Sequence, residues 1–368
     1  MNSESSLMDK LYTGEGGIDF VSRRKTWYQI TAGILIVCIA AILIRGFSLG
    51  IDFVGGTRIT MPAADLETTS VSETFTNATN VEPELVQIVG AGDSRILEIN
   101  SELLTQDQID AVRVALYEQY QPLGVNGQPT PDAIGDSTVS ESWGSTITTR
   151  MLIAMAVFLV AVFIYISLRL QREMAVAALG ALGVDLVAIA GIYALVGFEV
   201  SPATVIGLLT VLAFSLYDTV VVFDKVRENT LGYLGNKRIT YAEHANLAVN
   251  QTVMRSISTT VISALPIIAL MVIAVWLLGV GTLKDLALVQ LIGVIEGTLS
   301  SVFLATPFLV SLKNRKKETR EHTKEVLALR SGEVDLVESS KPAGQDKRSV
   351  VLPETSEQST GASWRPGR

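Results

Sequence analysis

The sequence is poor in the residues that build metal centres and covalent cross-links. Its 368 residues include one cysteine, Cys38, and two histidines, His244 and His322, which lie far apart in polar segments. A single cysteine cannot form an internal disulfide, and the separated histidines argue against a metal site. The chain also lacks a nucleophile–base pair and a phosphate-binding loop, so we expect neither an enzyme nor a cofactor.

Charge is scarce as well. Only 18% of the residues are charged, 48% are hydrophobic and the mean hydropathy is +0.39, while a pI near 5.0 gives no indication of nucleic acid as a partner. The chain instead has six apolar segments long enough to cross about 30 Å of hydrocarbon. They are Trp27–Ile44, Met151–Leu168, Met174–Val196, Pro202–Phe223, Ile257–Val280 and Leu286–Leu312. The sequence therefore predicts a membrane protein with a six-transmembrane α-helical bundle.

Basic residues near these segments predict the orientation, because Lys and Arg accumulate on the cytoplasmic side of a membrane. Four clusters fall on one side of a six-span chain: Arg23, Arg24 and Lys25; Arg169 and Arg172; Lys225, Arg227, Lys237, Arg238 and Arg255; and Lys313, Arg315, Lys316 and Lys317. The opposite side has only the single charges Arg45, Arg150 and Lys284. We expect a multi-pass protein of the cell (cytoplasmic) membrane with both termini cytoplasmic.

The long segment between the first two spans is acidic. Phe47–Ile147 contains three basic and fifteen acidic residues, a net charge of −12, so the rest of the chain sums to +4. Arg58–Met61, Leu85–Val89 and Arg95–Ile99 have the pattern of short strands, and Thr105–Tyr120 has that of an amphipathic helix. These patterns predict a small α+β domain, with a ferredoxin-like arrangement, on the extracytoplasmic side.

The expected organisation follows from these segments. It comprises a cytoplasmic N-terminus (1–26), a first transmembrane helix (27–46), the extracytoplasmic domain (47–147), a five-helix transmembrane region (148–312) and a cytoplasmic tail (313–368). The tail is polar, charged and nearly free of aromatic residues, so we expect it to be disordered.

One carboxylate lies where a membrane disfavours charge. Asp218 is about sixteen residues, or roughly 24 Å, from the start of the fourth span at Pro202. A charge at bilayer depth costs at least about 2.5–3.5 kcal/mol on insertion scales, so it usually lines a polar interior and has a function there. Its helical face includes Thr204, Gly207, Val211, Ser215 and Val222, and the small and hydroxyl residues among them would let another helix approach closely. A structural role in helix packing is the alternative.

Arg255 is the candidate counter-charge for Asp218. It begins the fifth span and is followed by hydroxyl residues, among them Ser258 and Thr259, that could line a hydrated path. An arginine at this position can also simply extend to the membrane interface. Asp185 and Glu296, midway along the third and sixth spans, are two further acids, and each could relay protons or bond to a neighbouring helix.

Two motifs surround these residues. The first follows the initial span and contains Gly50, Asp52, Gly55 and Gly56, whose glycines allow tight turns. The second continues the fourth span beyond the membrane and contains Thr219, Asp224, Arg227, Glu228 and Asn229. Together with the stretch from Asn250 to Thr260, they make the chain resemble SecF members of the SecD/SecF family, in the resistance-nodulation-division superfamily. The resemblance covers roughly Lys25–Lys316, and its style is similar to that of actinobacterial members.

The resemblance implies an accessory role in protein translocation. Six spans here would pair with six in SecD, and proton flow would move the outer domains that help a preprotein leave the SecYEG channel. The implied partners are SecD, SecYEG, the translocating preprotein and the lipid bilayer. In the family, the acid matching Asp218 and the arginine matching Arg255 belong to the proton path. The chain departs from many relatives at Val184-Asp185, where they carry His-Asp, and at Glu296, where we expect an uncharged residue.

Two other functions fit the same residues. The chain could be half of a lipid or drug exporter of the same superfamily, although such exporters usually carry twelve spans in one chain. It could also be a scaffold of the translocation complex that transports nothing, with Asp218 serving only in packing.

Overall fold

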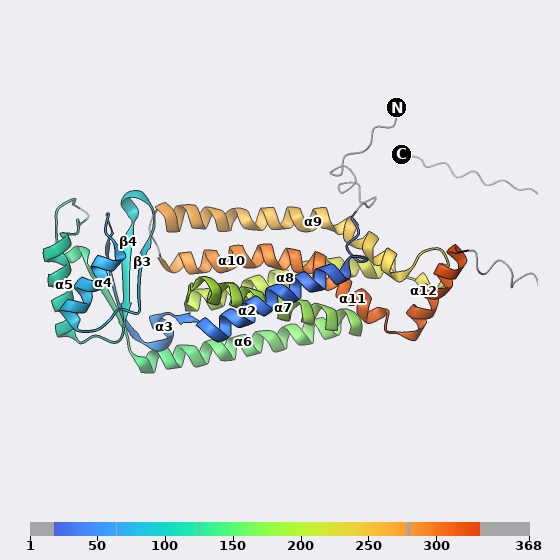
Figure 1. The fold of residues 1–368 in the computed structure, drawn as a ribbon, viewed down its shortest axis with the longest axis horizontal. Coiled ribbons are helices and arrows are strands. Elements are labelled where there is room, and N and C mark those ends of the chain that lie inside the picture. Colours follow the sequence, from blue (N-terminus) through green and yellow to red (C-terminus); the bar gives the residue numbers. More distant parts are fainter. Residues whose placement is uncertain (1–17, 64, 125, 278–280, 332–368) are drawn as a thin grey trace, which may run out of the picture.

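The protein is elongated, with a bundle of long helices and a small α+β domain at one end (Figure 1). The computed structural model describes residues 18–63, 65–124, 126–277 and 281–331. Most of the predicted N-terminal segment and the tail beyond residue 331 therefore lie outside the described residues.

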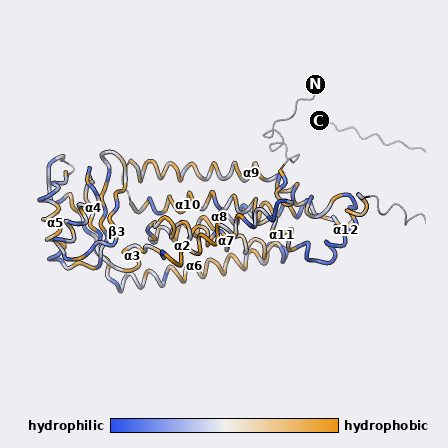
Figure 2. The backbone as a smooth tube through the Cα atoms, in the orientation of Figure 1, coloured by the Kyte–Doolittle hydropathy of each residue, from blue (hydrophilic) through white to orange (hydrophobic). Residues whose placement is uncertain are grey.

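Within the described ranges, six helices are long and apolar enough to cross a membrane, as the sequence predicted. The helices of the bundle are α2 (Arg24–Arg45), α6 (Glu141–Arg169), α7 (Arg172–Val196), α8 (Pro202–Asn229), α9 (Tyr241–Leu270), α10 (Gly281–Ser300) and α11 (Thr306–Lys313). The π-helical segment Met271–Leu277 extends α9, and the π-helical segment Ser301–Ala305 joins α10 to α11. Figure 2 shows hydrophobic residues along the length of these helices.

Two helices begin well before the apolar segments that revealed them. The α9 helix begins at Tyr241 rather than near Ile257, because Thr240 and Glu243 form a capping box that satisfies its first backbone N–H groups. The α6 helix begins at Glu141, where the Ser140 hydroxyl accepts from the backbone N–H of Trp143. Hydropathy detects only the apolar part of such a helix, so it placed both starts too late.

The segment between α2 and α6 contains a four-stranded antiparallel sheet covered on one face by two helices. Its elements are β2 (Gly56–Pro62), α4 (Thr68–Thr79), β3 (Leu85–Val89), β4 (Ile96–Ser101), α5 (Gln106–Tyr120) and β5 (Gly135–Val139), with strand order β3-β4-β2-β5. Ile59, Leu97, Phe75 and Val112 are fully buried between the sheet and the helices. The sequence analysis missed β5, because Gly135–Val139 is polar and largely exposed and therefore lacks the alternation of a half-buried strand.

A short connection joins this domain to the bundle. After α2 come β1 (Ser48–Leu49) and the one-turn helix α3 (Ile51–Val54), and β1 pairs in parallel with β6 (Glu199–Val200) between α7 and α8. Gly55 and Gly56 have φ of +85° and +139°, a region that favours glycine. A Cβ on either would also lie too close to backbone atoms, of Glu141 and Ser101 respectively. The glycines of this motif therefore form the tight turn through which the chain passes from α2 into the sheet.

The expectation of disorder from residue 313 onward is wrong for its first part. Lys317–Arg330 forms α12, in which Thr319, His322 and Val326 are buried, and Thr319 and His322 contact the connection between α8 and α9. The Thr319 hydroxyl lies 2.8 Å from the Tyr233 hydroxyl, and His322 Nε2 lies 2.9 Å from the Asn236 carbonyl oxygen. A few contacts on one face hold a helix whose composition is otherwise that of a solvated segment.

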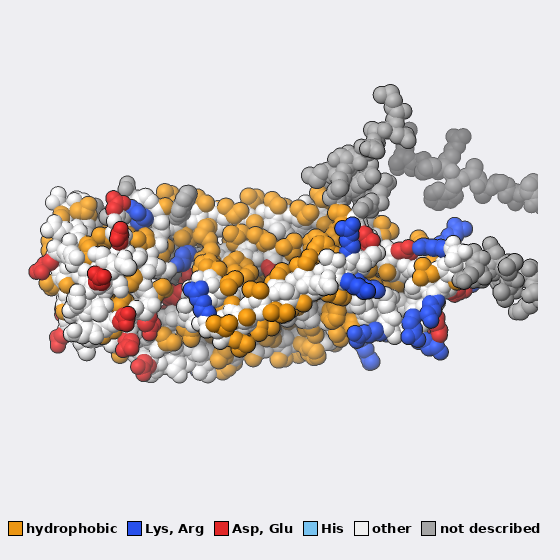
Figure 3. Space-filling view, in the orientation of Figure 1, with side chains coloured by type: hydrophobic (Ala, Val, Ile, Leu, Met, Phe, Trp, Pro, Cys, Tyr) orange, Lys and Arg blue, Asp and Glu red, His pale blue; other side chains and the backbone are white. Residues whose placement is uncertain are grey.

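The two ends of the molecule differ in charge. Figure 3 shows Asp and Glu side chains gathered over the α+β domain and most Lys and Arg side chains at the opposite end, around α12. The structure thus separates the acidic segment and the basic clusters by the full length of the helices.

Candidate functional site

Asp218 lies inside the bundle, on the face of α8 that packs against α10. Glycines bring the two helices close: a Cβ on Gly293 would overlap Val211, and one on Gly297 would overlap Ser215. Since residues three or four apart share a helix face, Asp218 on α8 and Ser301 after α10 continue this line of contacts. Gly207, which the sequence singled out on α8, also permits this close packing, because a Cβ there would overlap Val289 of α10.

Two serine hydroxyls hold the Asp218 carboxyl group. Ser256 on α9 donates to Asp218 Oδ1 at 2.8 Å, and Ser301 donates to Asp218 Oδ2. Asp218 is only 5% exposed, and Ser256 and Ser301 are buried with it. Ser301 begins the π-helical segment after α10, a kind of irregularity that is frequent at functional sites. Three helices thus meet at one carboxyl group, which we call the Asp218 site.

The structure does not bring Arg255 to Asp218, so the predicted counter-charge is wrong. Arg255 is exposed, and its Nη2 lies 3.4 Å from the hydroxyl of Tyr217, which is exposed as well. Neighbouring helix positions are rotated by about 100°. Because Ser256 faces Asp218, Arg255 has to point away from it. Among the described residues, no cation forms an ion pair with Asp218.

The hydroxyl path predicted on α9 is also displaced. Ser258 is exposed, and the Thr259 hydroxyl donates to the Arg255 carbonyl oxygen of its own helix. The inward positions are instead Ser256 and Thr260, one turn apart, and the Thr260 hydroxyl lies 2.6 Å from that of Thr298 on α10. Sequence reasoning missed Thr298 and Ser301, although hydroxyl residues inside an apolar span were a signal for them.

The sequence indicated no partner for Asp185 or Glu296, but in the structure these two side chains lie against each other. Asp185 on α7 is 1% exposed and accepts a hydrogen bond from Ser215 on α8 through Oδ2. The carboxyl group of Glu296 on α10 faces that of Asp185. Ser215 precedes Asp218 by one turn of α8, so the acid pair and the Asp218 site are neighbours in the bundle.

Except for Thr219, the other motif residues lie at helix ends or in the connection before the sheet. Thr219 is buried beside Asp218, whereas Asp224, Glu228 and Asn229 bond at the far end of α8 to Arg169, Lys225 and Gln251, respectively. Arg227 is exposed there. Gly50, Asp52, Gly55 and Gly56 lie in the connection that leads from α2 into β2, whose first residue is Gly56. In the described part of the chain, no group of three or more His, Cys, Asp or Glu side chains could hold a metal.

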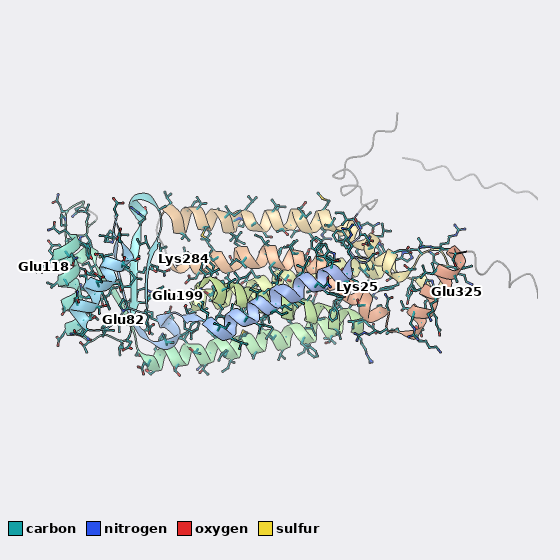
Figure 4. All side chains as sticks on the ribbon, in the orientation of Figure 1. Lys25, Glu82, Glu118, Glu199, Lys284 and Glu325 are labelled. Carbon is teal, nitrogen blue, oxygen red and sulfur yellow. The ribbon has the colours of Figure 1, made fainter. Side chains whose placement is uncertain are left out.

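A second buried polar cluster, which the sequence analysis did not find, joins the sheet to the bundle. Glu199 in β6 is 6% exposed and lies 2.7 Å from Arg58 Nη2, and Asn100 Nδ2 donates to it at 3.2 Å. Lys284 near the start of α10 donates to Gln87 Oε1 in β3 at 2.7 Å. Figure 4 shows Glu199 and Lys284 together at this boundary. Burial raises the pKa of Glu199 above its usual range, against the lowering effect of Arg58.

The fold and these clusters define a multi-pass membrane protein whose helical bundle encloses carboxyl groups and connects, through a polar junction, to an α+β domain. Residues 124–315 match the family model for the C-terminal part of the protein export membrane proteins SecD and SecF. Residues 40–64 match the model of the SecD/SecF GG motif. The chain belongs to the SecD/SecF family.

Individual relatives agree with this assignment. The chain is 53% identical to the protein translocase subunit SecF of Mycobacterium tuberculosis (strain ATCC 25618 / H37Rv), over 94% of this chain and 76% of that protein. It is 38% identical to SecF of Streptomyces coelicolor, over 94% of this chain and 90% of that protein. Among solved structures, the translocon-associated membrane protein SecDF of Thermus thermophilus aligns with a TM-score of 0.69 and 25% identity, over 82% of this chain and 39% of that one. The actinobacterial character expected from the sequence is confirmed.

Proposed function

We propose that this chain is an accessory subunit of the Sec preprotein translocase that pairs with SecD and uses the proton gradient to promote late steps of export through SecYEG. The observation that carries the proposal is the Asp218 site, a carboxyl group buried between three membrane helices and held by serine hydroxyls. The names of the relatives, a translocase subunit SecF and a translocon-associated SecDF, support the export role.

The Asp218 site is suited to both states of its carboxyl group. A serine hydroxyl can donate a hydrogen bond to a carboxylate and accept one from a protonated carboxyl group. Ser256 and Ser301 can therefore satisfy Asp218 whether or not it carries a proton, which a fixed arginine could not do. Taking up a proton removes a buried charge and changes the hydrogen bonds by which Asp218 connects α8 with α9 and with the end of α10. Each elementary charge that crosses about 100 mV supplies about 2.3 kcal/mol for such a rearrangement.

The α10 helix offers a direct route from the Asp218 site to the α+β domain. Its C-terminal end leads into Ser301, which bonds to Asp218, and its N-terminal end carries Lys284, which bonds to Gln87 of the sheet. A shift of α10 would thus move both the Asp218 site and its contact with the sheet. The Arg58–Glu199 pair adds a second link between the sheet and the α7–α8 connection.

We propose the same orientation as the sequence predicts, with both termini cytoplasmic in the cell membrane. The basic end of the molecule then faces the cytoplasm, and the acidic α+β domain is extracytoplasmic. The order of its strands and helices, with β2 and β4 as the central strands, supports a ferredoxin-like arrangement. Placed there, the domain can contact a preprotein as it leaves SecYEG.

The first test replaces Asp218 in cells depleted of the native protein. We expect Asp218→Asn to abolish export of a signal-peptide-bearing reporter while the complex with SecD still assembles, because the amide cannot take up a proton. The control is Glu118→Gln, an equivalent change at an exposed carboxylate on α5, which should leave export normal. Normal export in Asp218→Asn at matched protein levels would contradict the proposal and favour a scaffold.

The exporter alternative has one prediction of its own. Half of a lipid or drug exporter would leave reporter export intact when the whole protein is depleted, whereas an accessory translocase subunit would not. Depletion without any variant therefore separates the two functions.

A further inference from the structure

The contact between Asp185 and Glu296 places two acids together in the interior of the bundle, where the mechanism above does not use them. They come from α7 and α10, and Ser215 of α8 and Ser300 at the end of α10 stand beside Asp185. From α2, Cys38 is the titratable group near Glu296. In the described residues, no Lys, Arg or His forms an ion pair with either carboxyl group.

Two oxygen atoms of this cluster have no partner. Asp185 Oδ1 and Glu296 Oε2 are both fully buried and accept no hydrogen bond, and the buried hydroxyl of Ser300 is also without one. Asp185 is 1% and Ser300 6% exposed. Buried polar atoms nearly always have hydrogen-bond partners, so unpartnered atoms on neighbouring acidic side chains call for an explanation.

A single proton shared by Asp185 and Glu296 would explain these unpartnered atoms. Two carboxylates cannot both be charged at close range away from water, because their repulsion is weakly screened there. A proton on one carboxyl group is a donor to the other, which satisfies an orphaned acceptor and removes half of the buried charge. We infer that Asp185 and Glu296 hold one proton between them and form a second protonation site beside the Asp218 site.

The position of the pair deepens the proposed function, on which its role in export rests. Ser215 bonds to Asp185 and lies one turn from Asp218, while Ser300 beside Asp185 precedes Ser301, which bonds to Asp218. The two protonation sites thus share α8 and the end of α10. A change of charge at one site acts on the helices that hold the other.

Infrared spectroscopy of the complex with SecD in lipid nanodiscs tests the inference directly, because only a protonated carboxyl group has a carboxylic carbonyl band. The double variant Asp185→Asn/Glu296→Gln should lose one such band and one carboxylate band relative to the parent at neutral pH. The control is the double variant Asp110→Asn/Glu118→Gln, which changes two exposed acids on α5 and should lose two carboxylate bands only. Loss of two carbonyl bands, or of none, from the membrane pair would overturn the inference.

The single variants keep the test decisive if the double variant fails to assemble. Asp185→Asn and Glu296→Gln should each remove or shift the same carbonyl band, since the proton belongs to both groups. Effects on two different bands would overturn the inference. So would loss of the band on adding sodium at constant ionic strength, because the pair would then bind a cation.

The outcome is independent of the test of Asp218. The band should persist in Asp218→Asn, which retains both acids of the pair. Failed export in Asp218→Asn with no shared-proton band would refute the pair alone, whereas the band together with normal export would refute the proposed function alone.

Discussion

Two buried carboxyl groups, Glu199 and Asp218, are equally hidden from solvent but differently compensated. Glu199 is 6% and Asp218 5% exposed. Glu199 has the guanidinium group of Arg58 at 2.7 Å, whereas Asp218 has the hydroxyls of Ser256 and Ser301. A guanidinium group can only donate hydrogen bonds, so it fits one charge state, while hydroxyls fit two. The difference separates a carboxyl group that holds two parts of the molecule together through an ion pair from one whose hydroxyl partners fit either charge state, as the proposed function requires.

Breaking the Arg58–Glu199 pair should have the largest effect. We expect Arg58→Leu to destabilise the protein by about 3–5 kcal/mol, because it leaves a buried charge uncompensated. Thermal unfolding of the purified complex with SecD measures this loss. Arg113→Leu is the matched control, since Arg113 pairs with Asp110 and Asp136 at a more exposed place on the domain.

A second substitution shows whether the charge of Glu199 is the cause. In the double variant Arg58→Leu/Glu199→Gln most of the lost stability should return, because no buried charge remains. Equal stability of the parent and Arg58→Leu would mean that Glu199 needs no cation, and the contrast with Asp218 would disappear.

Removing a hydroxyl from the Asp218 site should have an intermediate effect. Ser256→Ala deletes the donor at 2.8 Å from Asp218 Oδ1, and hydrogen bonds to charged groups contribute about 1.5–3 kcal/mol. We expect a loss of stability in this range and slower export of the reporter. Ser258→Ala is the control on the same helix, because Ser258 is exposed. Similar losses in both variants would show that the inward face of α9 has no special role.

The sequence predicted the six spans and a carboxyl group at Asp218 inside the bundle, because both depend on local signals. Long apolar runs reveal helices, and a carboxylate inside one is conspicuous. It could not predict which hydroxyls reach Asp218, since this depends on the rotation of α9 and on the π-helical segment at Ser301. The assignment of Arg255 failed for that reason: one position along a helix separates facing the site from facing away.

The polar cluster around Arg58 and Glu199, between the sheet and the bundle, could not be predicted from the sequence for a different reason. Arg58 and Glu199 are separated by 141 positions in the chain, and the local sequence around either residue does not point to the other. Glu199 lies in β6, which pairs with β1, and strands of two residues each carry no detectable alternation. Non-local contacts of this kind come from the folded topology rather than from a local pattern.

The smallest expected effect is on the pH dependence of stability, in which the parent and Glu199→Gln should differ. Burial raises the pKa of Glu199, so the folded protein binds this proton more tightly than the unfolded chain does. The contribution of Glu199 to stability is therefore fully present below the ordinary pKa of glutamate and declines as pH rises through the raised value. Unfolding temperatures of the parent and Glu199→Gln, measured across that pH interval, should differ in slope, with the variant flatter. Parallel slopes would mean that Arg58 fully offsets the effect of burial on Glu199, so that protonation of this buried ion pair does not contribute to the pH dependence of stability.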